Sequence, residues 1–321
     1  MSSTRWFAVR KELRRRPRLV LTLLSFLLPI GLWCLVSYVP FLWHPKVEVT
    51  NPGGVGYFSE GMLLDKEVFA AETKAMQDRG GKVPEGNPAN PIYLPAPHEV
   101  VTAFYTAFTT EPKRRSEKWL HESLWDSIQV IFLGFFISSL IGVPLGIVAG
   151  TYDFFSRLFE PFIEFFRYLP APAFGALAVA ILGIHHAPKI AIIFIGTFFQ
   201  QLLVIANTTR KLDPALLEAA QTLGAKNHSL LFKVVVPGIL PDLYRDMRIL
   251  LGWAWTYLIV AELIGTSSGI TWFITQQARY KNFENVFAAI IMIGIIGLTI
   301  DLLLAWMGRR LFPWQQEPSK A

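Results

Sequence analysis

Long apolar segments without charge constrain this chain more than any other feature. Leu19 to Trp43 contains no charged side chain, and residues 127–152 lie between Asp126 and Asp153 without one. Both segments exceed the roughly 20 apolar residues that a helix needs to cross a bilayer. The 321 residues are 52% hydrophobic and only 17% charged, with a mean hydropathy of +0.39. We therefore predict an all-α integral membrane protein.

Six apolar segments are candidate membrane spans. Arg14, Arg15, Arg16 and Arg18 precede the first segment, and Arg309 and Arg310 follow the last. Because cations flank the cytoplasmic ends of spans, we expect both termini in the cytoplasm. The first segment lacks a small-residue cleavage site and is predicted to be a retained signal anchor. The six spans are expected at roughly Leu19–Trp43, 127–152, Pro170–His185, Pro188–Thr208, Met247–Gly265 and Asn285–Gly308.

The spans divide the chain into four parts. Residues 1–43 are expected to form a basic cytoplasmic N-terminus and the first span, and residues 313–321 a cytoplasmic tail. Residues 44–123 are expected outside, as a periplasmic segment extended by an insertion at 44–90. There, Lys66 to Arg79 has the pattern of a short amphipathic helix. Residues 124–312 form the predicted transmembrane core, with a cytoplasmic loop at 210–241.

Glycine recurs at multiples of four in the second span. Gly134, Gly142, Gly146 and Gly150 fall on one face of a helix. Small residues let helix backbones approach closely inside a membrane. We expect this face to pack tightly against a neighbouring helix.

The polar segment after the fourth span has clear helix-start and helix-stop signals. Asp213 can cap a helix, Pro214 suits its first position, and residues 215–223 are good helix formers. Gly224 then supplies a stop. Arg210 and Lys211 mark the cytoplasmic side, so this short helix is predicted to be exposed there.

This segment resembles the EAA loop of membrane subunits of binding-protein-dependent ABC importers. The pattern is Glu218-Ala219-Ala220, three residues, Gly224, nine residues, an aliphatic residue, one residue, an aliphatic residue and Pro237. Val234 and Val236 stand where that family usually has Ile and Leu. The resemblance implies a type I ABC importer permease fold, with ATPase subunits docking at Glu218, Ala219, Ala220, Gly224 and Pro237.

The same resemblance implies the rest of the assembly. It predicts a second copy of the permease, ATPase subunits, an external solute-binding protein and a location in the bacterial inner membrane. The sequence contains no Gly-rich phosphate loop of the Gly-x-x-x-x-Gly-Lys-Ser/Thr type. ATP and Mg²⁺ are therefore expected in the partner ATPase subunit, and no cofactor is expected in this chain.

Two further stretches resemble the nitrate, sulfonate and taurine branch of the family. Residues 92–101 are similar to its Leu-Pro-Ser-Pro entry, which leads into an amphipathic helix before the second span. Residues 252–257 and Ala261-Glu262-Leu263 are similar to its Ala-Trp segment. The resemblance implies a small, anionic solute, whose identity is set largely by the binding protein.

Four residues are candidates for the substrate pathway, each with a structural alternative. Trp255 and Thr256 could line the path or pack in the core. Glu262 could act at a gate or form a structural hydrogen bond. For Asp301 we favour the structural hydrogen bond. A charge inside hydrocarbon costs at least about 2.5 kcal/mol, so each acid should face protein or water. Arg248 could attract anions at the exit or extend to the interface.

The sequence argues against several other functions. It has no catalytic constellation, no metal site and a single cysteine, Cys34. Its basic residues lie beside apolar spans, which argues against nucleic-acid binding. A transport subunit is thus favoured over an enzyme. The alternatives are a secondary transporter or channel without an ATPase, and an intramembrane hydrolase or lipid transferase.

Overall fold

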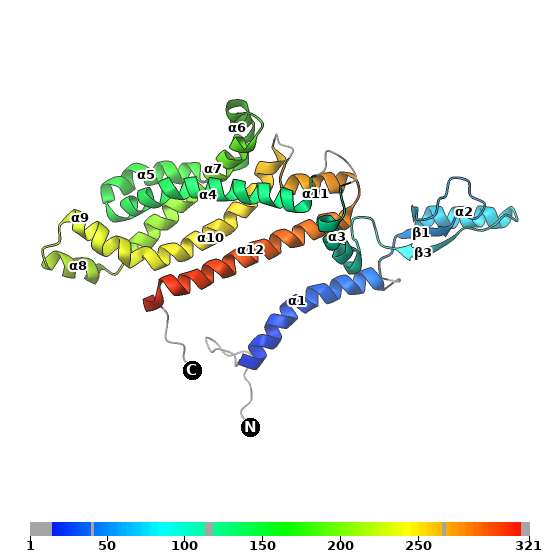
Figure 1. Ribbon diagram of the computed structural model, residues 1–321, viewed down its shortest axis with the longest axis horizontal. Coiled ribbons are helices and arrows are strands. Elements are labelled where there is room, and N and C mark those ends of the chain that lie inside the picture. Colours follow the sequence, from blue (N-terminus) through cyan, green and yellow to red (C-terminus); the bar gives the residue numbers. More distant parts are fainter. Residues whose placement is uncertain (1–14, 40–41, 113–117, 265–267, 316–321) are drawn as a thin grey trace, which may run out of the picture. The chain divides into compact units, whose positions relative to one another are not determined.

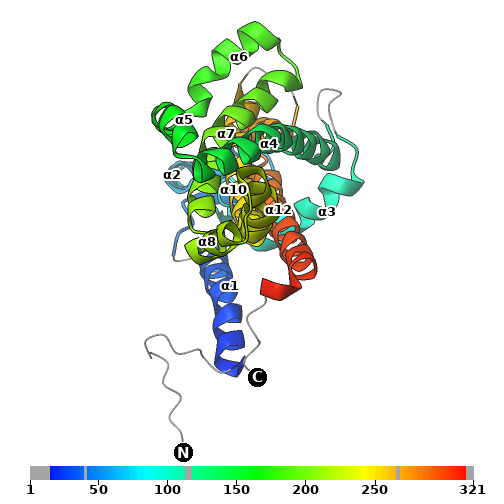
Figure 2. The same ribbon diagram turned by 90° about the vertical axis from the view of Figure 1, so that its left-hand side faces the viewer.

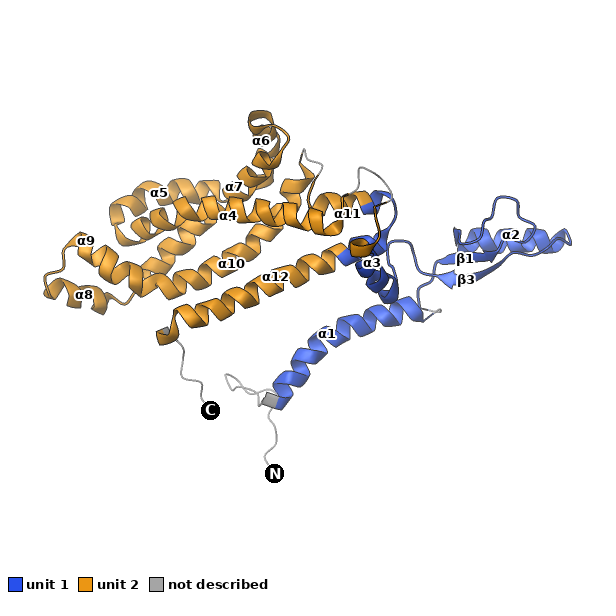
Figure 3. Cartoon of the chain, viewed as in Figure 1, with its two compact units in different colours: residues 1–106, 277–288 blue, residues 107–276, 289–321 orange. Residues whose placement is uncertain are grey.

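Most of the protein is helical (Figures 1 and 2). The computed structural model describes residues 15–39, 42–112, 118–264 and 268–315. The basic residues up to Arg14, the predicted end of the fifth span at Gly265 and most of the predicted tail lie outside these ranges. The chain divides into two compact units (Figure 3): unit 1 comprises residues 1–106 and 277–288, and unit 2 comprises residues 107–276 and 289–321.

Unit 1 contains one long apolar helix and a small mixed module. Its elements are α1 (Arg15–Tyr38), β1 (Lys46–Asn51), β2 (Leu63–Asp65), α2 (Lys66–Asp78), β3 (Glu85–Ala89) and most of α3 (Pro97–Thr109). The predicted amphipathic helix at Lys66–Arg79 is confirmed by α2, and the predicted helix before the second span is confirmed by α3.

The three strands correct the expectation of an all-α protein. They form an antiparallel sheet in the order β2-β1-β3, in which Val47 pairs with Leu64 and with Pro88. Val49 and Phe58 are buried beneath α2, where Phe58 stacks on Phe69 at 6.0 Å. The strands have only six, three and five residues, so their sequence lacks the long alternating pattern that predicts strands.

The regular elements of unit 2 are all helices in its described residues. Its elements are α4 (Leu120–Thr151), α5 (Asp153–Phe166), the 3₁₀ turn η1 (Ala171–Phe174), α6 (Gly175–Leu182), α7 (His186–Arg210), α8 (Pro214–Thr222), α9 (Asn227–Leu230), the π-helical turn η2 (Leu231–Val235), α10 (Val236–Leu263), α11 (Ile270–Arg279), α12 (Phe283–Leu311) and the 3₁₀ turn η3 (Pro313–Gln315). α11 and α12 also contribute residues to unit 1.

Four described helices are long and apolar enough to cross a membrane: α1, α4, α7 and α12. The predicted third span is not one straight helix. α6 has eight residues, or about 12 Å at 1.5 Å per residue, far less than the roughly 30 Å of hydrocarbon. α5 and α6 together form a fifth candidate, with a bend of 81° between them. Figure 2 shows the change of direction from α5 to α6.

The predicted fifth span coincides with α10 from Met247 to Leu263, and α10 starts well before Met247. α10 is not among the four apolar helices, because Asp242, Arg245, Asp246 and Arg248 occupy its first half. Its uncharged stretch then extends only from Ile249 to Ala261.

The glycine face of α4 packs against α7, which confirms the predicted close approach. A Cβ on Gly134 would lie 2.8 Å from Ile193, and one on Gly146 would lie 2.8 Å from Ile205. A Cβ on Gly150 would lie 2.5 Å from Thr209. Residues later in α4 contact residues later in α7. The two helices therefore run side by side in the same direction.

Candidate coupling site and buried polar contacts

The coupling segment, residues 210–241, contains the helix that the sequence predicts. Oδ1 of Asp213 accepts a hydrogen bond from the amide of Ala215 at 3.0 Å and so caps α8. Gly224 ends the turn after α8 with a φ of +83°, which glycine adopts without the steric cost of a Cβ. Local sequence chemistry therefore sets both ends of α8.

α8 presents an exposed surface. None of its residues is buried, and all of them belong to the described part of the chain. Glu218 and Ala219 are exposed, and Ala220 is half-buried. Leu223, directly after the helix, is 89% exposed. α8 and α9 lie at the end of unit 2 opposite α11 (Figure 1). The helix thus has the exposure and the apolar side chains that a docking element needs.

Glu218 and Pro237 differ in where they lie along their helices. Glu218 lies in the middle of α8 rather than in its first turn, so its carboxylate is not placed at the helix N-terminus. Pro237 does not end a second short helix; it is the second residue of α10, directly after the π-helical turn Leu231–Val235. Proline has no N–H to donate, and a position in the first turn of a helix tolerates that loss.

Two contacts join the end of α7 and the linker after it to α10. The hydroxyl of Thr208 donates to the carboxylate of Asp246 and joins α7 to α10. Leu212 packs so closely on Gly238 that a Cβ there would lie 2.8 Å from Leu212 Cδ1. Sequence reasoning missed both contacts, because the partners are far apart along the chain and follow no motif.

The structure pairs Arg248 with Asp301. Nη2 of Arg248 donates to both carboxylate oxygens of Asp301, at 2.8 and 2.9 Å, and Nε donates at 3.2 Å. This forked geometry is the strong form of an arginine–carboxylate contact. The sequence indicates that a charge inside an apolar segment needs a partner. In the structure, Arg248 of α10 and Asp301 of α12 are each other's partner.

Trp255 and Thr256 point in different directions. Trp255 is half-buried and packs against the apolar core of unit 2, whereas Thr256 is exposed. With Arg248 at Asp301 and Glu262 in a separate buried cluster, the four pathway candidates occupy different surroundings.

Glu262 is 1% exposed and holds the start of α11. Its carboxylate accepts hydrogen bonds from the hydroxyl of Ser127 and, at 2.8 Å, from the amide of Thr271. The same hydroxyl accepts from the amide of Ile270 at 2.8 Å. Gly269 has a φ of +104°, and a Cβ there would lie 2.1 Å from the carboxylate. A buried acid of α10 and a serine of α4 therefore satisfy the first two amides of α11.

Lys189 of α7 hydrogen-bonds to Ser268, just before the start of α11. It is fully buried near the start of α7, and its Nζ donates to the carbonyl oxygen of Ser268 at 2.7 Å and to its hydroxyl at 3.0 Å. Sequence reasoning missed Lys189, although a single lysine inside the apolar Pro188–Thr208 segment was a usable signal.

The structure shows long apolar helices that could cross a membrane and one exposed polar-flanked helix, α8. Comparison with known proteins identifies the class of membrane protein. Residues 142–314 match the family described as "Binding-protein-dependent transport system inner membrane component". The chain belongs to this family and is a permease subunit of an ABC importer.

Its relatives are transport permeases. The chain is 31% identical to the taurine transport system permease protein TauC of Escherichia coli, over 71% of this chain and 82% of that protein. It is 34% identical to a probable ABC transporter permease protein of Brucella abortus, over 60% and 77% of the two chains. It is 24% identical to the nitrate import permease protein NrtB of Synechococcus elongatus, over 68% and 81%.

Solved structures agree on the fold. The chain superposes on a chain of the MetNI methionine ABC transporter in an inward-facing conformation with a TM-score of 0.54 and 19% identity. The match covers 64% of this chain and 100% of that one.

Proposed function

We propose that this chain moves a small anion of the sulfonate or nitrate class inward across the bacterial cytoplasmic membrane. The working assembly contains two copies of the chain, ATPase subunits and an external solute-binding protein. The observation that carries the proposal is the exposed α8, with Glu218, Ala219 and Gly224, on a chain whose relatives include taurine and nitrate permeases. ATP and Mg²⁺ bind in the ATPase subunits.

We further propose six membrane crossings with both termini in the cytoplasm. α4 and α7 run in the same direction, so the chain must recross the membrane between them, and the bent α5–α6 pair supplies that crossing. α10 supplies the fifth, because Arg248 is paired with Asp301 and Glu262 is hydrogen-bonded inside the protein. α1 and α12 are the first and last spans.

The solute is tested by transport. The purified permease, ATPase subunits and binding protein are reconstituted in vesicles, and ATP-driven uptake of taurine, ethanesulfonate and nitrate is measured against methionine. We expect uptake of at least one of these three solutes, each of which carries a sulfonate or nitrate group, and none of methionine. ATP-independent uptake would contradict the proposal and favour a secondary transporter or channel.

The docking role of α8 is tested at Gly224. Gly224→Val places a β-branched side chain at a φ of +83° and should distort the end of α8, whereas asparagine adopts this conformation more readily. We expect Gly224→Val to lower co-purification of the ATPase subunits at least about tenfold, a loss of about 1.4 kcal/mol, and Gly224→Asn to retain it. Equal binding by the two variants would remove α8 as the docking element.

A further inference from the structure

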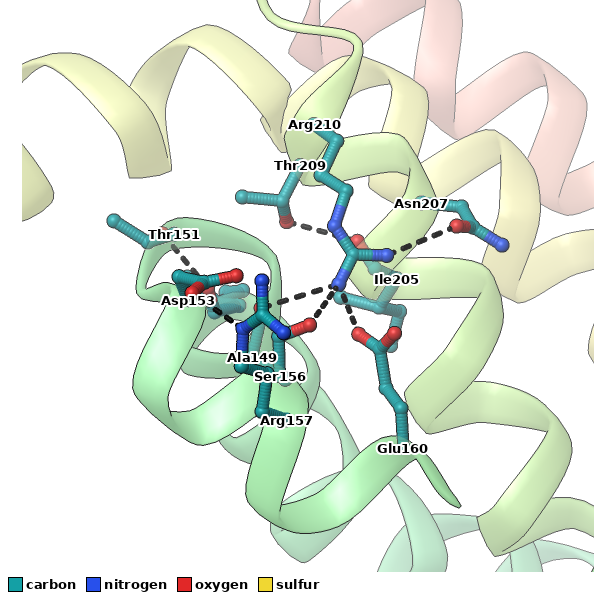
Figure 4. Close-up of polar contacts among 11 residues, drawn as sticks. Ala149, Thr151, Asp153, Ser156, Arg157, Glu160, Ile205, Asn207, Thr209 and Arg210 are labelled. Carbon is teal, nitrogen blue, oxygen red and sulfur yellow. Dashed lines mark hydrogen bonds and ion pairs between the residues drawn. The ribbon is translucent and has the colours of Figure 1, made fainter. Parts of the chain in front are cut away.

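Arg210, the last residue of α7, connects the coupling segment to α5 (Figure 4). Its Nη2 donates to the hydroxyl of Ser156 at 2.9 Å and pairs with the carboxylate of Glu160. The same nitrogen lies 3.4 Å from the carbonyl oxygen of Ala149 at the end of α4, and Nη1 donates to Asn207 at 3.3 Å. One guanidinium thus joins the ends of α4 and α7 to the polar face of α5.

Position along the chain gives this contact its significance. Only Lys211 and Leu212 separate Arg210 from Asp213, the cap of α8. Leu212 is itself packed against Gly238 of α10, so this two-residue linker has little freedom to move independently of α8. A displacement of α8 therefore reaches Arg210 directly.

The other side of the contact is an element that can transmit movement. α5 packs through Phe159 and Ile163 on α4 and α7, and it continues through a bend of 81° into α6. Apolar packing of this kind lets helices slide, whereas a charged, hydrogen-bonded contact fixes their register. The Arg210–Glu160 pair is partly shielded, with side chains 37% and 21% exposed, so solvent screens it less than a surface pair.

We propose that Arg210 is a positioning residue that makes α5 move with the coupling segment when ATP binds. The inference rests on the proposed function and adds to it the path by which force leaves α8. Removal of the pair should leave α8 able to follow the ATPase subunits while α5 stays behind.

Nearby, the structure offers a matched control. Arg157 and Asp153 form an ion pair on α5 at 2.7 Å, but their side chains are 80% and 76% exposed and both belong to one helix. Figure 4 shows this pair beside Arg210. Its loss removes a charge from α5 without touching α7 or α8.

The test measures the movement of each helix separately in the assembled transporter. Because Cys34 is the single cysteine, a Cys34→Ser background allows one nitroxide per chain, at Leu158→Cys on α5 or Leu216→Cys on α8. Both sites are exposed, and in a two-copy assembly each gives one distance between copies by pulsed electron spin resonance. Spectra are compared without nucleotide and with ATP and vanadate.

In the labelled Cys34→Ser protein with Arg210 and Glu160 intact, we expect ATP to shift the distance at residue 158 and the distance at residue 216. Arg210→Gln and Glu160→Gln should retain the shift at residue 216 and reduce the shifted population at residue 158 at least about fivefold. Arg157→Gln should retain both shifts. A shift at residue 158 in Arg210→Gln and Glu160→Gln equal to that in Arg157→Gln would overturn the inference. If ATP leaves the distance at residue 216 unchanged in the background protein, the proposed function itself fails.

Discussion

Glu262 illustrates how a single buried charge is accommodated in an apolar core. Its carboxylate accepts hydrogen bonds from the hydroxyl of Ser127 and the amide of Thr271. These two donors replace the water molecules that a buried carboxylate would otherwise need. The same contacts cap α11, whose first amides have no partner within their own helix. Glu262 therefore organises the end of unit 2 that lies opposite the coupling segment.

Loss of this carboxylate should destabilise the protein. Glu262→Ala leaves the buried amide of Thr271 without its acceptor, which costs about 1–3 kcal/mol. Glu262→Gln should cost less, because its carbonyl can still accept from Thr271. Its NH₂ can donate to Ser127, whose hydroxyl can turn to the carbonyl of Ser123, 3.1 Å away. Thermal unfolding in detergent measures the difference.

The matched control is Glu164→Ala, which removes an exposed acid on α5. We expect its unfolding temperature to equal that of the original protein. If Glu262→Ala unfolds at the same temperature as Glu164→Ala, the capping role of Glu262 is wrong.

Sequence reasoning reached part of these contacts. It identified Glu262 and Asp301 as charges that need partners, because both interrupt apolar runs. It did not name Ser127 or pair Arg248 with Asp301, since these partners lie far apart along the chain. Which atoms meet depends on how the helices pack.

At the scale of elements, α4 and α7 form a close interface. The glycine face of α4 admits the β-branched side chains Ile193 and Ile205. Between these contacts, Gln201 of α7 accepts from Ser138 at 2.7 Å and donates to Ser139 at 3.2 Å, so its buried amide is satisfied. The interface combines close packing with one polar link.

A large side chain on this face should separate the two helices. In Gly146→Leu the first added carbon would lie 2.8 Å from Ile205 Cβ, and overpacking of this kind costs about 1–3 kcal/mol. Gly297→Leu on α12 is the control, since no atom lies within 4 Å of its Cβ position. Unfolding temperatures should fall for Gly146→Leu only; equal temperatures would refute the close contact.

Element prediction worked where a single property dominated. Apolar length predicted α1, α4, α7 and α12, and cap chemistry predicted α8. Pattern reasoning predicted neither the bend between α5 and α6, in the region of the third span, nor the β1–β3 sheet. A bend and a three-stranded sheet depend on contacts between segments, which local propensity does not contain.

For the whole molecule, the decisive relation is the common direction of α4 and α7. Two spans that run the same way need a return crossing between them, and the described elements there are α5, the 3₁₀ turn η1 and α6. The proposed six-span arrangement rests on this relation and on the paired charges of α10.

Accessibility of single cysteines tests this topology. In the Cys34→Ser background, Ile184→Cys lies between α6 and α7 and should react with a membrane-impermeant maleimide added outside intact cells. Leu158→Cys and Leu216→Cys should react only after the membrane is opened. All three positions are more than half exposed in the chain. Labelling of Leu216→Cys in intact cells would reverse the proposed orientation.

The sequence by itself determined the membrane class, the long spans, the packing face of α4 and the ends of α8. These features depend on the transfer of side chains out of water and on local backbone preferences, which each short segment carries in its own residues. Only the tertiary structure decided that Arg248 pairs with Asp301, that Glu262 caps α11 and that Arg210 reaches α5. Such contacts join residues distant along the chain, so they are fixed by the packing of whole helices.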